Sequence, residues 1–138
     1  MPRKPAVAGM FYPKNPEELK KQIQQYLEQA ELIDTHGKLK ALIVPHAGYI
    51  YSGIVAAQGY KLLEAYSFKK VLLLGPSHYQ AFNGAAIAEE DFQTPLGIVK
   101  VGDTKSWLKE NLIVSYPEAH AAEHSIEVQL PFLQETLG

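Results

Sequence analysis

Residues 39–49, Leu-Lys-Ala-Leu-Ile-Val-Pro-His-Ala-Gly-Tyr, contain the stretch that decides the fold class. The nearly unbroken apolar run before Pro45 predicts a buried strand, because strands covered on both faces are apolar at almost every position. Apolar residues recur at helical spacing over residues 52–65, and a second apolar run at 71–75 predicts another buried strand. Strand, helix and strand in this order form a βαβ unit, whose strands are parallel. We therefore expect an α/β fold with three layers and a mostly parallel sheet.

Further elements are expected on both sides of this unit. Asn15 can cap a helix that starts at Pro16 and ends near Gly37, with Glu18 at the capping-box position. Residues 84–88 and 97–101 are predicted as shorter strands around a turn at 94–95. The stretch from about residue 121 is helical in pattern, and Pro131 should kink or split it.

Length and composition limit the classes of protein and of partner. The 138 residues fit a single domain, 1–138. A formal net charge of -2 offers no basic surface for nucleic acid or for an anionic membrane, and no apolar run is long enough to cross a bilayer. A cytoplasmic protein is the simplest expectation. Because there is no cysteine, metal ligands must come from His, Asp, Glu or Tyr.

Two histidines follow the two predicted buried strands. His46 comes directly after the first strand, and His78 follows the second after a Gly-Pro-Ser turn. The carboxyl ends of parallel strands open onto the same edge of a sheet, and neighbouring strands lie roughly 5 Å apart. Both imidazoles can therefore converge on one ion. Imidazole suits iron, copper, nickel and zinc, and two imidazoles with one carboxylate leave coordination positions open.

Four strings distributed over the chain resemble the Memo family in order and context. They are AVAGMFYP at 6–13, PHAGY at 45–49 with YSG at 51–53, LGPSH at 74–78, and EHSIE at 123–127. The resemblance is to Memo proteins of the AmmeMemoRadiSam system protein B type. Memo proteins are similar in fold to class III extradiol dioxygenases, which are non-haem iron enzymes.

The resemblance implies a metal pocket and roles for particular residues. It carries His46 and His78 over as metal ligands, with iron(II) or copper as the expected ion and zinc as the next choice. His124 is expected at the pocket wall as an acid or base, oriented by Glu123 or Glu127. Tyr49 and Ser77 are the predicted substrate-binding residues. The implied function is oxygen-dependent or redox chemistry on a small molecule.

The chain departs from the family in its length. Memo proteins are roughly twice as long, and this chain matches their N-terminal half. The remaining metal ligand is then expected from the other half, from an Asp, Glu or His of this chain, or from a neighbouring chain. Self-association, or a partner that supplies the other half, is expected on the same grounds.

Two other functions fit parts of the sequence. His120, Glu123 and His124 match the inverted zincin pattern, in which two histidines one helical turn apart bind zinc and the glutamate activates water. This pattern predicts a zinc metallopeptidase, although Pro117 leaves little helix before it. The second alternative is a non-catalytic module that binds a peptide or an anion through backbone N–H groups near Gly48 and Ser77.

Overall fold

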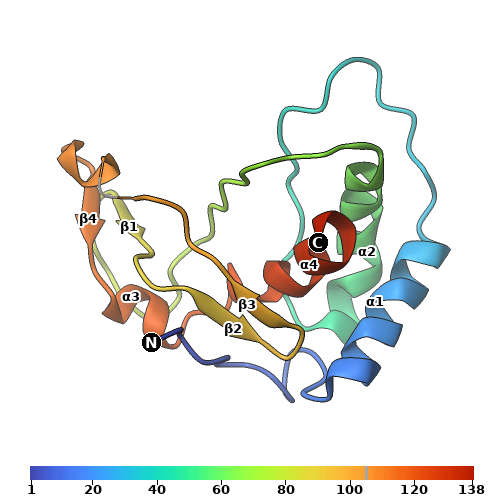
Figure 1. Cartoon of the computed structure of the whole chain (residues 1–138), viewed down its shortest axis with the longest axis horizontal. Helices are drawn as coiled ribbons and strands as arrows, with labels where there is room; N and C mark the ends of the chain where they lie inside the picture. The colour runs from blue at the N-terminus through green and yellow to red at the C-terminus, as the bar shows by residue number, and fades with distance from the viewer. Residues whose placement is uncertain (105) are drawn as a thin grey trace.

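A computed structural model describes residues 1–104 and 106–138. Three helices, α1, α2 and α4, pack together at one end of the molecule, while α3, β1 and β4 lie at the other end (Figure 1). The hairpin of β2 and β3 lies between these two groups (Figure 1). The helices are α1 Pro16–Gln29, α2 Tyr49–Lys61, α3 Glu118–Ala121 and α4 Leu130–Leu137, the 3₁₀ turns are η1 Leu62–Ala65, η2 Trp107–Lys109 and η3 Glu127–Gln129, and the strands are β1 Ala85–Ile87, β2 Phe92–Thr94, β3 Gly97–Val99 and β4 Ile113–Ser115.

The helices form where local signals predict them. The Asn15 side chain accepts hydrogen bonds from the N–H groups of Glu17 and Glu18, which confirms the predicted cap of α1. Leu19 and Ile23 on this helix are fully buried against α2 and α4. Pro131 lies in the first turn of α4, where its missing N–H costs no hydrogen bond. None of the described helices combines the length and the apolar character that a membrane span requires.

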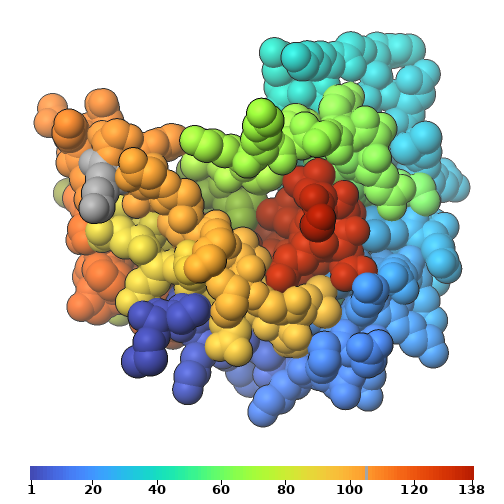
Figure 2. Space-filling model, viewed as in Figure 1, coloured from blue at the N-terminus to red at the C-terminus, as the bar shows by residue number. Residues whose placement is uncertain are grey.

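The core lies among these three helices. Tyr60 of α2 stacks on Phe132 of α4 with ring centroids 4.9 Å apart. Tyr49, at the start of α2, contacts the same phenylalanine ring at 5.0 Å. In the space-filling view the C-terminal helix is enclosed by α1 on one side and the β2–β3 hairpin below (Figure 2). The C-terminal stretch is thereby held against the N-terminal third of the chain.

The structure is a mixed α/β fold with two small sheets. β1 and β4 are parallel, with Ala85 opposite Ile113, and β2 and β3 form an antiparallel hairpin. The turn of this hairpin is Pro95-Leu96, one residue later than the predicted turn at 94–95, and Gly97 follows it with a φ of 128° that only glycine adopts readily. β1 and β3 fall within the two short strands that the sequence predicts. β4, the parallel partner of β1, was not predicted.

The βαβ unit predicted around the first helix crossover is wrong. Neither 39–45 nor 71–75 is a strand, and no backbone–backbone hydrogen bond joins them to each other or to another described residue. Leu42 and Val44 pack against the core, but the alternate residue Ile43 is fully exposed and Leu74 is 83% exposed. A strand needs a neighbour for its backbone N–H and C=O groups. The described residues supply none here, so apolar composition alone does not produce a sheet.

The carboxylate of Glu127 in η3 binds the N-terminal segment. Glu127 is completely buried and accepts hydrogen bonds from the N–H groups of Ala6 and Val7 and from the Tyr12 hydroxyl, at 2.7–3.0 Å. Arg3 adds an ion pair at 2.9 Å. Burial, with the bond to Glu127, raises the pKa of Tyr12, so the phenol remains a donor. These contacts hold residues 123–127 in place beside the N-terminal loop.

Candidate metal centre

Three imidazole rings, those of His46, His78 and His124, lie close together in the structure. The ring centroids of His46 and His78 are 5.2 Å apart, and His124 lies 4.5 Å from His78 and 5.9 Å from His46. One ring nitrogen from each histidine lies within 4.8 Å of the corresponding atoms of the other two. The predicted convergence of His46 and His78 is confirmed, although the strands expected to cause it are absent.

Side-chain hydrogen bonds from Ser125 and Gln129 hold the loops that carry His78 and His46. The Gln129 side chain donates to the carbonyl of Pro45, directly before His46, at 3.1 Å. The Ser125 hydroxyl donates to the carbonyl of Pro76 at 2.8 Å, which holds the loop that carries His78. A side chain at Gly75 would collide with Ser125, since an added Cβ would lie 2.6 Å from its hydroxyl oxygen. The histidines therefore approach because the C-terminal segment binds both loops.

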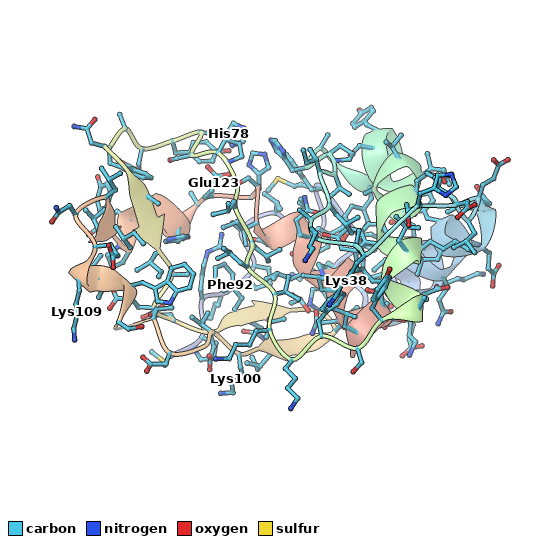
Figure 3. The ribbon with its side chains drawn as sticks, turned by 90° about the horizontal axis from the view of Figure 1, so that it is seen from above. Lys38, His78, Phe92, Lys100, Lys109 and Glu123 are labelled. Carbon is cyan, nitrogen blue, oxygen red and sulfur yellow. The ribbon has the colours of Figure 1, made fainter. Side chains whose placement is uncertain are left out.

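Glu123 lies beneath the cluster as a nearly buried carboxylate. It accepts hydrogen bonds from the backbone N–H groups of His78, His124 and Ser125 at 2.6–2.8 Å, and its Oε1 lies 3.0 Å from His78 Nδ1. Burial acts to raise the pKa of Glu123, but the hydrogen bonds from these three residues outweigh it and lower the pKa to about 2. Figure 3 shows Glu123 and His78 close together on one side of the molecule.

His124 has the properties of a metal ligand. Burial lowers its pKa, Glu123 opposes this, and the neighbouring rings of His78 and His46 lower the pKa further. These effects favour the neutral imidazole, which is the form that binds metals. Its Nδ1 is buried and has no hydrogen-bond partner among the described residues. An unpartnered nitrogen next to two more imidazoles fits a cation, since buried polar atoms otherwise find a partner.

A cavity of about 660 Å³ lies beside His78 and has room for a small molecule. Ser77, His78, Tyr79 and Glu123 line one part of it. The Ser77 hydroxyl donates to the Gln80 carbonyl at 2.7 Å and remains exposed, so its substrate-binding role stays a prediction.

Tyr49, the other predicted substrate-binding residue, is 3% exposed, and its hydroxyl donates to the carbonyl of Val128 at 2.7 Å. The structure places this hydroxyl in the core, away from the residues that line the cavity.

Comparison with known proteins gives the family. The family model described as Memo-like protein matches residues 3–138. The chain belongs to the Memo family. It is 45% identical to a MEMO1 family protein of Aquifex aeolicus over 96% of its length, 40% identical to one of Methanocaldococcus jannaschii over 96%, and 43% identical to one of Methanopyrus kandleri over 100%. These alignments cover 49%, 50% and 53% of the relatives, so this Memo chain spans about half their length.

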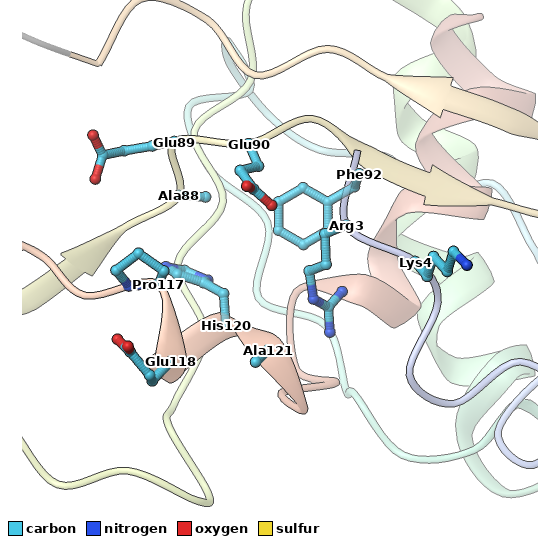
Figure 4. A pocket seen from close by; sticks show the side chains of 10 residues that line it. All are labelled: Arg3, Lys4, Ala88, Glu89, Glu90, Phe92, Pro117, Glu118, His120 and Ala121. Carbon is cyan, nitrogen blue, oxygen red and sulfur yellow. The ribbon is translucent and has the colours of Figure 1, made fainter. Parts of the chain in front are cut away.

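The zincin pattern is not assembled in this Memo-family chain. Helix α3 ends at Ala121, before Glu123, so His120 and His124 are not one helical turn apart on a common helix. His120 is absent from the histidine cluster, and its Nε2 lies 3.1 Å from the Ala86 carbonyl oxygen. It lines a cavity of about 390 Å³ with Arg3 and Phe92 (Figure 4), and it also borders the 660 Å³ cavity that His78 lines. The described residues therefore give the metallopeptidase prediction no support, because α3 ends before Glu123 and His120 lies outside the histidine cluster.

Sequence reasoning missed two features of the Memo site. It placed His124 at the pocket wall, whereas the structure brings His124 into the same group as His46 and His78. It offered Glu127 as an orienting residue, but Glu127 binds the N-terminal segment and Glu123 alone contacts the cluster. The EHSIE string gives the order of these residues along the chain, but it does not show which way each side chain points. The absence of cysteine was a usable signal, since it excludes thiolate ligands, but it leaves His, Asp, Glu and Tyr as candidates and does not select His124.

Proposed function

We propose that this chain binds one transition-metal ion through His46, His78 and His124, and that the site carries out oxygen-dependent or redox chemistry on a small molecule. The observation that carries the proposal is the meeting of three imidazoles whose ligand atoms lie within 4.8 Å of one another. Three neutral nitrogen ligands leave coordination positions for oxygen or substrate.

The chemistry of the donors narrows the choice of metal. Imidazole nitrogen suits iron, copper and zinc, and the described cluster contains no thiolate or carboxylate ligand. Iron(II) or copper is the proposed ion because each can change its oxidation state, and zinc is the next choice. When bound, such an ion would supply electron transfer or activation of oxygen. The protein would contribute the ligands, the adjoining cavity and the hydrogen bonds that orient the rings.

Metal binding by histidine variants tests this proposal. We expect the purified protein to bind one equivalent of iron(II), added without oxygen, and His46→Ala, His78→Ala and His124→Ala each to lose that equivalent. His120→Ala and His36→Ala are the matched controls, since neither residue belongs to the cluster, and both should bind as the unmodified chain does. Metal loss in His120→Ala with retention in His46→Ala would overturn the site.

The role of His124 is decided by the same series. We assign it as the third ligand, whereas the sequence predicts an acid or base. If His124→Ala keeps the metal at unchanged affinity but loses oxygen uptake, the acid–base role is correct and the ligand assignment is wrong. If it loses the metal, the ligand assignment stands.

Turnover separates an enzyme from a binding module. Oxygen uptake with catechol-like reductants should be stimulated by iron(II) or copper and abolished by His78→Ala. Binding of a peptide or an anion without metal-dependent uptake would favour the non-catalytic module instead.

We also propose that the complete fold is larger than the described chain. A three-layer, mostly parallel sheet of the class III extradiol dioxygenase type needs strands at 39–45 and 71–75, which here lack neighbours. The relatives contain about as many residues again beyond the matched part. A second polypeptide or a second copy of this chain is the proposed source of the missing neighbours.

A further inference from the structure

Glu123 contacts two of the three clustered histidines, and the two contacts differ. Its Oε1 lies 3.0 Å from Nδ1 of His78 and 3.5 Å from Nδ1 of His124, and only the first is a hydrogen bond. We propose that Glu123 is a positioning residue that holds the ring proton of His78 on Nδ1, so that Nε2 is the nitrogen this ring offers to a metal ion. The inference rests on the proposed metal site and specifies which nitrogen of His78 would bind the ion.

The direction of the hydrogen bond follows from the other donors to the same oxygen. Oε1 accepts the backbone N–H groups of His124 at 2.7 Å and of Ser125 at 2.8 Å, so it presents lone pairs. The His78 nitrogen facing it must then donate. A neutral imidazole carries one N–H, which leaves the lone pair on the other nitrogen. The nitrogen left with a lone pair on His78 is Nε2.

A second contact fixes the orientation of the same residue. Glu123 Oε2 accepts the backbone N–H of His78 at 2.6 Å. One carboxylate therefore holds this histidine at its main chain and at its ring, which restricts rotation of the side chain. The carboxylate is 7% exposed, and its hydrogen bonds gain strength from this low-dielectric position. The His78 ring is 38% exposed, so burial of the ring alone does not fix it.

The same geometry leaves Nδ1 of His124 without a hydrogen bond. Oε1 already accepts three donors, more than the two lone pairs of a carboxylate oxygen readily serve, and this explains why His124 Nδ1 remains unbonded at 3.5 Å. Glu123 thus orients His78 through the ring and His124 through the backbone only. Removal of a carboxylate that orients a metal-binding histidine typically lowers the metal affinity roughly 10–100-fold.

The test measures the tautomer first, without metal. Long-range proton–nitrogen NMR on the metal-free protein should show the His78 proton on Nδ1. In Glu123→Ala the proton should move to Nε2, and the affinity for Zn²⁺, measured by titration calorimetry, should fall roughly 10–100-fold. Glu123→Gln keeps an oxygen acceptor and should restore the Nδ1 proton.

Glu127→Ala is the matched control. It removes an equally buried carboxylate that also accepts several hydrogen bonds, but one that does not touch His78. A merely structural role for Glu123 would make both variants alike, whereas we expect only Glu123→Ala to change the tautomer.

A His78 proton on Nε2 in the unmodified protein overturns the inference, whether or not Glu123→Ala folds. A Glu123→Ala protein with unchanged tautomer and affinity overturns it as well. If the unmodified chain shows the Nδ1 proton but binds no Zn²⁺ or iron(II), the positioning role stands and the proposed metal site fails.

Discussion

Glu123 and Glu127 are four residues apart, and their side chains bind different parts of the chain. Glu123 binds His78 and the backbone N–H groups of His124 and Ser125, while Glu127 binds the N-terminal segment. Both carboxylates are nearly or fully buried, and each accepts several hydrogen bonds that compensate the cost of burying charge. The segment therefore ties the first residues of the chain to the candidate site.

Tyr12→Phe tests this connection at the level of one hydrogen bond. The Tyr12 hydroxyl donates to Glu127 Oε1 at 2.7 Å in the core. Its loss should lower the free energy of unfolding by roughly 1–3 kcal/mol, as measured by urea denaturation, because a buried carboxylate loses a donor. Tyr51→Phe is the control, since that side chain is 81% exposed and should change stability by less than about 0.5 kcal/mol. Equal effects of both substitutions would contradict the assignment.

At the scale of elements, α1 and α2 approach closely at one glycine. An added Cβ at Gly53 would lie 2.4 Å from a ring carbon of Tyr26. That ring is held in place because its hydroxyl donates to the carbonyl of Tyr49 at 3.0 Å. The contact orients α2, whose first turn follows His46 directly.

Gly53→Ala should therefore destabilise the protein, although alanine favours helices. Overpacking of this kind costs about 1–3 kcal/mol, which exceeds the roughly 1 kcal/mol of helix propensity that alanine gains. Thermal unfolding monitored by circular dichroism measures the difference. Gly102→Ala has no atom within 4 Å of the added Cβ and should leave the midpoint nearly unchanged. An unchanged midpoint for Gly53→Ala would show that the Tyr26 ring can move aside.

At the scale of the whole molecule, apolar side chains are exposed in 39–45 and 71–75, the two segments that were predicted as strands. Ile43 and Leu74 are 102% and 83% exposed, and residues 71 and 72 are also exposed. Exposed apolar groups on unpaired backbone favour association with another chain.

We expect the isolated chain to self-associate through these segments. Sedimentation velocity should show concentration-dependent association that Ile43→Lys with Leu74→Lys weakens by placing charge on the apolar surface. Leu112→Lys, at a comparably exposed position beside β4, is the control and should leave association unchanged. A strictly monomeric chain at all concentrations, or equal effects of the three substitutions, would exclude this surface as the interface.

The sequence by itself determined the parts that depend on neighbouring residues. The cap at Asn15, the start of α1 and the helical spacing in α2 are local, and the structure confirms them. The ends of elements were less exact, since α1 ends at Gln29 and not near Gly37, and the turn before Gly97 lies one residue later than predicted. The four strings at 6–13, 45–53, 74–78 and 123–127 together were sufficient for the family, and His46 and His78 within them gave the metal hypothesis.

Only the tertiary structure decided what depends on residues distant in sequence. It brought His124 into the cluster and gave the ring of His78 its partner Glu123, 45 residues away. It also left 39–45 and 71–75 without sheet partners. The physical reason is shared by these findings: a metal site or a β-ladder exists only where groups from separate segments meet, whereas a helix satisfies its backbone within itself.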